Sequence, residues 1–137
     1  MAVAFLNRFA ASAVTPEACV VDFADACRGK RDELGDIESN REHFEILGAR
    51  LGEPIVSIRP GAQTADIAVS CSFDSRILSC DGMGEGCAEG TVGSVAGTCI
   101  LTSVREPDGW RLCTSNFAGA PGPPASDIAQ SFFGARR

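Results

Sequence analysis

Two apolar, β-branched segments decide the fold of this chain: Thr98-Cys-Ile-Leu-Thr-Ser-Val104 and Trp110-Arg-Leu-Cys-Thr-Ser-Asn-Phe117. Between them stands Glu106-Pro-Asp-Gly109, where proline presets φ and glycine readily takes a positive φ, so the sequence predicts a tight turn joining two strands. Strict alternation along the second strand would place Leu112 and Ser115 on opposite faces. A hairpin alone is only marginally stable in water, so these strands require further strands and a helical cover.

The residues before this hairpin also have strand character. Ile55–Ile58 is a short apolar run, and residues 65–73 alternate apolar side chains with small or polar ones, which is the pattern of a half-buried strand. Residues 76–80 would continue that strand or pair with it. Residues 81–97 contain six glycines and predict a loop or a bulged crossover.

The first half of the chain predicts helices. Residues 2–11 form an amphipathic pattern, and residues 15–29 begin with a hydroxyl, a proline and an acid, the order typical of a helix start. Residues 30–36 are charged and would form a solvated connection. Ser39-Asn-Arg-Glu42 matches a capping box and predicts a third helix over residues 39–51.

Helices followed by about four to six strands predict an α+β domain, in which N-terminal helices pack on a curved antiparallel sheet. We expect this domain to cover residues 1–117. Residues 118–137 form a Gly/Pro-rich segment and a C-terminal tail, in which residues 126–133 would make a short helix or a docked tail.

Composition narrows the function classes. The net charge of −6 and the pI near 4.7 disfavour nucleic acid and anionic membrane surfaces, because both attract basic proteins. No apolar run of about 18 residues is present to span a bilayer. Residues 1–16 lack acidic side chains, which faintly resembles an organellar presequence, but an amphipathic first helix is the preferred interpretation.

The chain has seven cysteines and no C-x-x-C motif, so the usual redox and zinc motifs are absent. An odd number leaves at least one thiol unpaired in a monomer. For the cysteines around the glycine-rich segment, Cys80, Cys87 and Cys99, there are three interpretations: a disulfide, a metal site or reduced thiols. A metal site is disfavoured, and Cys80–Cys87 is the disulfide expected if the protein is oxidised. Cys19, Cys27 and Cys71 are expected to pack as small apolar side chains. Cysteine abundance does not fix the compartment, and we expect the cytoplasm before an organellar or exported location.

Three stretches carry a resemblance to a known family: Phe5-Leu-Asn-Arg-Phe9, Phe44-Glu-Ile-Leu47 and Asp108-Gly-Trp-Arg-Leu112. Over residues 2–117 the chain resembles the nuclear transport factor 2-like superfamily, which has a cystatin-like α+β cone. This resemblance implies an apolar pocket between helix and sheet. Some members use such a pocket for isomerisation, hydrolysis or dehydration of small molecules, and others bind partners without catalysis, so the fold does not choose a function.

A pocket enzyme would require a carboxylate or an imidazole inside the cone. The candidates are His43, Asp66 and Asp74. Asp66 falls on the polar face of its strand, Asp74 suits a strand end, and His43 flanks the apolar stripe of its helix, so each also has a structural explanation. The segment Gly82-Met-Gly-Glu-Gly86 lacks both phosphate-loop patterns and has acidic neighbours, which favours a flexible acidic loop.

We therefore expect a non-catalytic binding or assembly module with a cone-shaped apolar pocket, without a cofactor or metal. A homo-oligomer or a protein partner is expected, with an apolar small molecule as a further ligand. The partner-binding candidates are Ile100, Thr102 and Val104 on the hairpin, and Phe132 and Phe133 in the tail. One alternative is a small pocket isomerase, hydrolase or dehydratase, and another is an exported disulfide-bearing domain.

Overall fold

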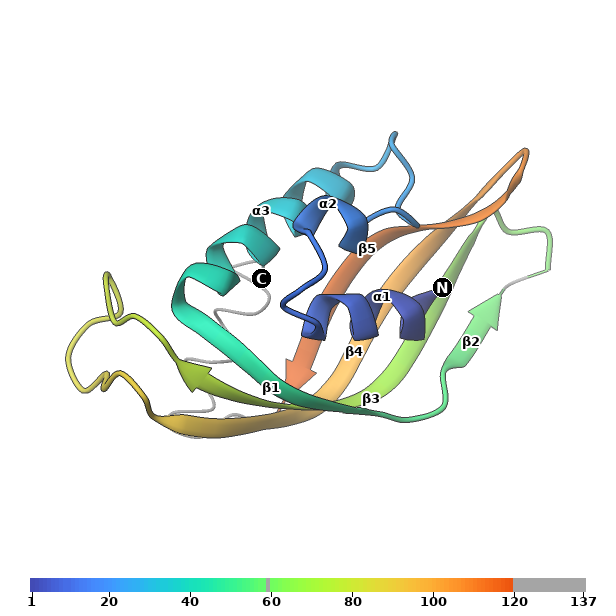
Figure 1. The fold of residues 1–137 in the computed structure, drawn as a ribbon. Helices are drawn as coiled ribbons and strands as arrows, with labels where there is room; N and C mark the ends of the chain where they lie inside the picture. Colours follow the sequence, from blue (N-terminus) through green and yellow to red (C-terminus); the bar gives the residue numbers. More distant parts are fainter. Residues whose placement is uncertain (59, 120–137) are drawn as a thin grey trace.

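The structure is a computed structural model, and it describes residues 1–58 and 60–119. Over these described residues, three helices precede five strands, in the predicted order (Figure 1). The elements are α1 (Ala2–Ala10), α2 (Pro16–Cys19), α3 (Arg28–His43), β1 (Phe44–Leu51), β2 (Ile55–Ile58), β3 (Thr64–Ile77), β4 (Val92–Glu106) and β5 (Gly109–Gly119).

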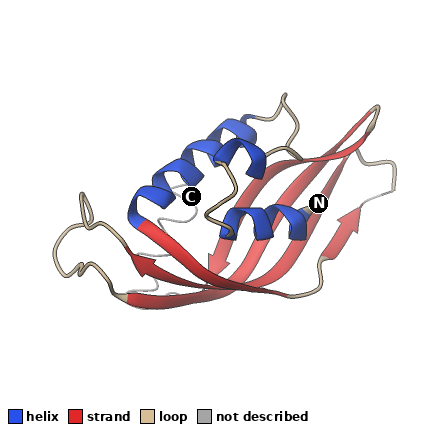
Figure 2. Cartoon of the chain, in the orientation of Figure 1, coloured by secondary structure: helices blue, strands red, loops and turns tan. Residues whose placement is uncertain are grey.

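One antiparallel sheet has the order β1-β3-β4-β5, and β2 also pairs with β3. The predicted hairpin is confirmed, because Glu106 pairs with Gly109 at the turn and β4 and β5 pair from there as far as Gly97 and Gly119. The β3–β4 loop protrudes at the end of the sheet opposite the β4–β5 turn (Figure 1). The described helices all cover one face of the sheet, which confirms the predicted α+β arrangement (Figure 2).

The core fills the space between the helices and the sheet. The ring of Phe5 lies 5.0 Å from that of Phe23, and the ring of Phe9 lies 5.8 Å from that of Phe73 on β3, so aromatic contacts join the layers. The buried face of α1 contains Ala2, Phe5, Leu6 and Phe9. The Arg41 guanidinium on α3 donates a hydrogen bond of 2.9 Å to the Ala11 carbonyl, which fixes the chain after α1 against α3.

The helix predicted over residues 39–51 is wrong. Residues 30–36, expected to be a solvated connection, lie inside α3, and the chain changes to strand at Phe44. Phe44 pairs with Ile77 and Leu51 pairs with Cys71 along β3. The apolar positions of this segment fit a helical stripe and a strand face equally well, and pairing with β3 satisfies the backbone as a strand.

The helix predicted over residues 15–29 is correct only at its start. The Thr15 hydroxyl accepts a hydrogen bond from the Ala18 N–H, which caps α2, but α2 ends at Cys19. After α2, the Ala24 N–H donates to the Leu112 carbonyl at 2.7 Å, and the Leu112 N–H donates to the Asp22 backbone carbonyl at 2.8 Å. These bonds to β5 replace the bonds that a continued helix would make.

A bulge in β5 overturns the predicted alternation of its faces. Thr102 pairs with Thr114, but Ser103 pairs with Leu112, so Cys113 is an extra residue in the strand. Leu112 and Ser115 consequently share the buried face. The glycine-rich loop is also shorter than predicted, because β4 begins at Val92.

Three disulfides cross-link the described residues: Cys27–Cys113, Cys71–Cys99 and Cys80–Cys87. The expectation that Cys27 and Cys71 pack as reduced, apolar side chains is therefore wrong. Cys27 is bonded to Cys113 and Cys71 to Cys99, and the sequence does not show that these partners lie beside them in the folded chain. Cys19 is a free, buried thiol. Within residues 1–58 and 60–119, no helix is long and apolar enough to cross a membrane.

Candidate functional site

An apolar groove lies between the start of α1 and the β2–β3 edge of the sheet. Its volume is about 390 Å³. The residues that line it are Met1, Ala2, Val3, Pro54, Val56, Ile58, Ala65, Ile67, Ser103 and Trp110. The lining side chains with polar atoms capable of conventional hydrogen bonds are Ser103 and Trp110, and none of the lining side chains is ionisable.

Cross-strand pairs between β2 and β3 build one wall of this apolar groove. Val56 pairs with Ile67, and Ile58 pairs with Ala65, and all four side chains line the groove. All of β2 is exposed, with Val56 and Ile58 each 54% exposed. The chain therefore holds apolar side chains in contact with water at this edge, which is the usual mark of a binding surface.

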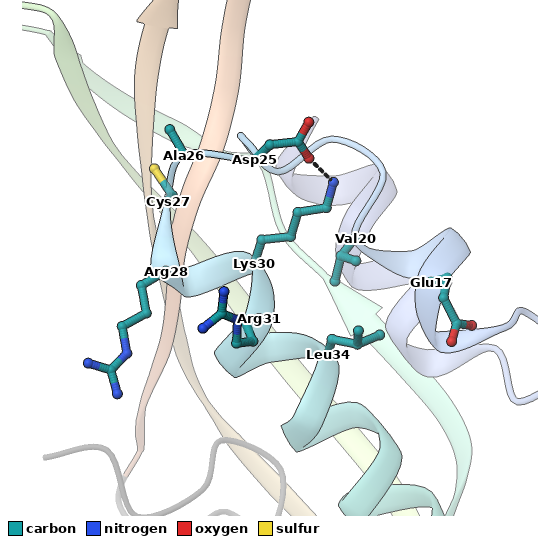
Figure 3. Close-up of a pocket in the computed structure, with 9 residues that line it drawn as sticks. All are labelled: Glu17, Val20, Asp25, Ala26, Cys27, Arg28, Lys30, Arg31 and Leu34. Atoms are coloured by element: carbon teal, nitrogen blue, oxygen red, sulfur yellow. Dashed lines mark hydrogen bonds and ion pairs between the residues drawn. The ribbon is translucent and has the colours of Figure 1, made fainter.

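A second, polar groove lies beside the first turn of α3, with a volume of about 610 Å³. Its lining residues are Glu17, Val20, Asp25, Ala26, Cys27, Arg28, Lys30, Arg31 and Leu34 (Figure 3). Lys30 reaches across to Asp25, whose carboxylate lies 2.5 Å from the Lys30 Nζ. The Lys30 ammonium holds the pKa of Asp25 below its usual value through this hydrogen bond and its charge.

Under α3 the interior holds polar side chains. Glu33, Ile37 and Asn40 form the buried face of the helix, and Ser75 and Ser115 are buried on the sheet. The Asn40 Nδ2 and both serine hydroxyls have no hydrogen-bond partner among the described residues. Such groups cost about 1–3 kcal/mol each when left unpaired, so they are available to bound water or to a polar group of a ligand.

A void of about 10 Å³ touches Asn40, between Phe9 on α1 and Phe44 on β1. That is room for about one water molecule. This void is too small for an organic ligand, whereas the apolar groove is large enough for one.

The three catalytic candidates from the sequence lie on separate parts of the fold. His43 ends α3, and its Nδ1 lies 3.3 Å from the Ser79 carbonyl. Asp66 is exposed on β3 opposite Thr102 and Ser57. None of the three lines the apolar groove.

Asp74 lies on the outer face of the sheet in a polar cluster. Arg50 donates to both of its carboxylate oxygens, at 3.0 and 3.2 Å, and Ser94 donates at 2.5 Å. The hydrogen bonds from Arg50, followed by that from Ser94, lower the pKa of Asp74. A carboxylate held ionised in this way is a poor general base, and this contact ties β1 to β3.

The hairpin residues proposed for partner binding lie on the outer face of β4. Ile100 is 40% exposed, and Thr102 and Val104 are partly exposed. The Thr102 and Thr114 hydroxyls are 2.6 Å apart and join β4 to β5. Phe132 and Phe133 lie outside the described residues, as does the tail prediction for residues 126–133.

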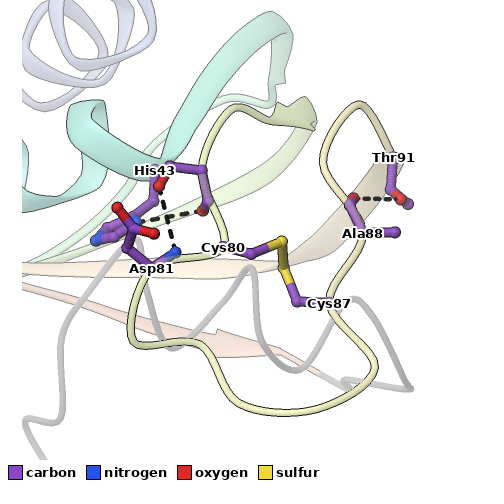
Figure 4. The surroundings of a disulfide bond; sticks show 7 residues. His43, Cys80, Asp81, Cys87, Ala88 and Thr91 are labelled. Carbon is purple, nitrogen blue, oxygen red and sulfur yellow. Dashed lines mark hydrogen bonds between the residues drawn. A yellow bond between two sulfur atoms is a disulfide. The ribbon is translucent and has the colours of Figure 1, made fainter.

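The Cys80–Cys87 disulfide closes the β3–β4 loop upon itself (Figure 4). The Asp81 N–H donates to the Ser79 hydroxyl at 3.2 Å, and the Thr91 hydroxyl donates to the Ala88 carbonyl at 2.7 Å. Within residues 1–58 and 60–119, no group of three histidine, cysteine or carboxylate side chains is arranged to hold a metal ion.

Sequence reasoning missed Glu33, the only carboxylate among the described residues that is fully buried. The charged neighbours of Glu33 predict a solvated connection at this position. Its spacing from Ile37 and Asn40, at i, i+4 and i+7, was the available signal for one buried helix face. The resemblance implies an apolar pocket but does not identify its lining residues, because residues from α1, β2 and the hairpin meet there only in the folded chain.

No protein-family model and no curated protein sequence matches this chain. Solved structures do match its fold. A ketosteroid isomerase-like protein from Erwinia carotovora atroseptica SCRI1043 has a TM-score of 0.66 at 14% identity, covering 88% of this chain and 92% of its own. A conserved protein from Planctomyces limnophilus DSM 3776 has a TM-score of 0.58 at 16% identity, covering 87% and 91%.

A protein of unknown function from Mycobacterium tuberculosis is also similar, with a TM-score of 0.54 at 8% identity over 85% of this chain and 72% of that one. These matches show a shared fold, in which helices cover one face of an antiparallel sheet. The chain has the fold of the nuclear transport factor 2-like superfamily, as the resemblance implied.

Proposed function

We propose that this chain is a non-catalytic module that binds a small apolar molecule in the apolar groove. The observation that carries the proposal is a volume of about 390 Å³ lined without a single ionisable side chain. Small-molecule sites usually have volumes of about 300–1,000 Å³. No lining side chain of the groove can act as a general acid or base, which favours binding over catalysis.

The two polar groups of the groove define the ligand further. Ser103 and Trp110 can each form a hydrogen bond, while the other lining side chains offer only apolar contact. The preferred ligand is therefore an uncharged, mainly apolar molecule with one or two hydroxyl or carbonyl groups.

The three disulfides support an oxidising compartment for this module, in place of the cytoplasmic location expected from the sequence. The outer face at Ile100, Thr102 and Val104 remains the proposed surface for a homo-oligomer or protein partner. Native mass spectrometry tests that surface, since Ile100→Lys would shift an oligomer to monomer and leave a monomer unchanged.

Energy transfer from Trp110 tests binding in the groove directly. Trp110 is the only tryptophan and the chain has no tyrosine, so excitation near 295 nm reports this residue alone. Titration with N-phenyl-1-naphthylamine, a neutral apolar fluorophore, should quench Trp110 emission and raise the emission of the probe.

Two alanines on β3 give a matched pair of variants. Ala65 lines the groove, and Ala68 lies on the opposite face of the same strand. We expect Ala65→Leu to weaken probe binding by about tenfold or more, because the larger side chain occupies the groove, and Ala68→Leu to leave it unchanged. Equal affinities for the two folded variants would overturn the assignment of the groove.

A further inference from the structure

Two of the three disulfides are partly exposed, and their electrostatic surroundings differ in sign. Cys27 lies in the polar groove with Arg28, Lys30 and Arg31. Cys80–Cys87 encloses a loop that contains Asp81 and Glu85, with Glu89 following, and residues 78–91 contain no lysine or arginine. The third disulfide, Cys71–Cys99, is buried, with its cysteines 4% and 0% exposed.

Cys27 is half-buried at the polar groove. Cys27 is the residue before α3, makes no side-chain cap to the helix, and lines the groove of about 610 Å³ (Figure 3). Its partner Cys113, the bulge residue of β5, does not line that groove. A small molecule that enters the groove therefore reaches Cys27, whereas Cys113 lies on the strand side of the bond.

The cations at the groove outnumber its acids. Arg28, Lys30 and Arg31 line it together with Glu17 and Asp25. Lys30 is offset by Asp25, and Arg28 lies 3.7 Å from Asp32 in a largely exposed pair. Arg31 has no ion pair among the described residues, and the first turn of α3 contains no acid to oppose the positive end of the helix dipole.

We propose that Cys27 is a thiol–disulfide exchange site for small thiols that carry a carboxylate or sulfonate. The thiolate of such a molecule attacks the Cys27 Sγ and forms a new S–S bond with it, while the Cys27–Cys113 bond breaks. Its electron pair leaves with the Cys113 Sγ as a thiolate, which takes a proton from water. The disulfide count is unchanged, and the bound thiol keeps its anion beside Arg28 and Arg31.

Thiols of opposite charge test this proposal on the intact chain. The oxidised protein is treated briefly with 2-mercaptoethanesulfonate or with cysteamine at low ionic strength, and singly modified peptides are mapped by mass spectrometry. Sulfonate adducts should appear first on Cys27, and cysteamine adducts first on Cys80 or Cys87. The ratio of the two opening rates should change by about tenfold or more between the thiols, in line with electrostatic control of association.

The comparison of two disulfides in one molecule cancels the intrinsic reactivity of each thiol. Salt should reduce the difference, because the Debye length falls from about 10 Å at 0.1 M to about 3 Å at 1 M. The same order of opening with both thiols would overturn the proposal, as would sulfonate adducts that appear first on the acidic loop or on Cys113. Adducts on Cys71 or Cys99 mark unfolded protein and provide an internal check of the native state.

A charge variant links the selectivity to the groove. Arg28→Gln with Arg31→Gln removes two exposed cations and should bring the sulfonate preference for Cys27 down by several fold. Arg50→Gln removes a cation on the outer face of the sheet and should leave the preference unchanged. An unaltered preference in the double variant, with circular dichroism showing a native fold, would contradict the role of these arginines.

Discussion

The disulfides Cys27–Cys113 and Cys80–Cys87 have similar Cα separations, 5.3 and 5.9 Å, but they constrain the molecule on different scales. The first joins residues 86 apart in sequence and fastens α3 to β5, while the second joins residues 7 apart within one loop. The loop entropy that a disulfide removes from the unfolded chain grows with the logarithm of loop length. One bond therefore stabilises the packing of the layers, and the other shapes a single loop.

Removal of the Cys27–Cys113 disulfide should change the stability of the protein more than any other substitution considered below. Cys27→Ser with Cys113→Ser should lower the free energy of unfolding by about 4.6 kcal/mol, and Cys80→Ser with Cys87→Ser by about 2.4 kcal/mol, from loop entropy. Urea unfolding followed by circular dichroism measures both. A greater loss for the loop variant would show that the long disulfide does not hold the layers together.

Crowding of the backbone where α3 packs against β5 should have the next largest effect on stability. A Cβ at Gly29 would clash with the Cys113 carbonyl oxygen, whereas Gly35 on the same helix has open space. Gly29→Ala should destabilise the protein by about 2–3 kcal/mol through overpacking. Gly35→Ala should stabilise it by about 0.5–1 kcal/mol through helix propensity.

The two glycine variants differ only in position along α3, so each serves as the control for the other. Thermal unfolding provides the measurement. Similar melting temperatures for the two variants would mean that α3 is not held against Cys113.

Cys19 is the one cysteine of the seven without a disulfide partner, and an exposed thiol in its place would be able to exchange with either disulfide. Cys19 is buried, its Sγ donates to the Arg8 carbonyl at 3.3 Å, and desolvation raises the pKa of its thiol despite the nearby Arg41. Cys19→Ala should cost about 1 kcal/mol for the lost packing atom. All three disulfides should still form.

Alkylation in urea without reductant tests the state of Cys19. It should modify one thiol in the wild-type protein and none in Cys19→Ala, as measured by intact mass. More than one modified thiol in the wild-type chain would contradict the three pairings.

The smallest expected effect concerns a junction held by charge. Arg50 and Ser94 lower the pKa of Asp74, so the ionised form is favoured in the folded state. Its stabilising contribution is present above the unfolded pKa of about 3.9 and is lost as the pH falls through the lower folded pKa. Asp74→Asn should be slightly less stable than wild type at pH 7, and the difference should close below about pH 4.

Asp66→Asn is the matched control for this last measurement, because Asp66 lies on the same face of β3 without an ion pair among the described residues. It should change stability less than Asp74→Asn at pH 7. Equal changes in both variants would mean that the Arg50 contact adds nothing to the β1–β3 junction.

Local sequence was sufficient where neighbouring residues decide the structure. The Glu106-Pro-Asp-Gly109 turn, the alternation along β3 and the apolar face of α1 each follow from short-range patterns, and all three appear in the fold. The Thr15 cap was also predicted, since capping needs only the next few residues.

Where two structures compete for one pattern, tertiary contacts decided. The apolar positions at Phe44 and Leu51 suit a helix or a strand, and the partner strand β3 selects the strand by pairing with both residues. The lining of the apolar groove and the burial of Glu33 likewise could not be predicted from local sequence, since their surroundings come from distant parts of the chain.

Composition and short-range patterns were enough to predict the α+β class, the hairpin, the acidic charge and the loop cysteines that can meet across a few glycines. Long-range contacts set the α3–β1 boundary, the partner of Cys27 and the β5 bulge that brings Leu112 and Ser115 to one face. The physical reason is range. A turn or a cap is stabilised by adjacent residues, whereas a disulfide that spans 86 residues forms only after the sheet and helix have met.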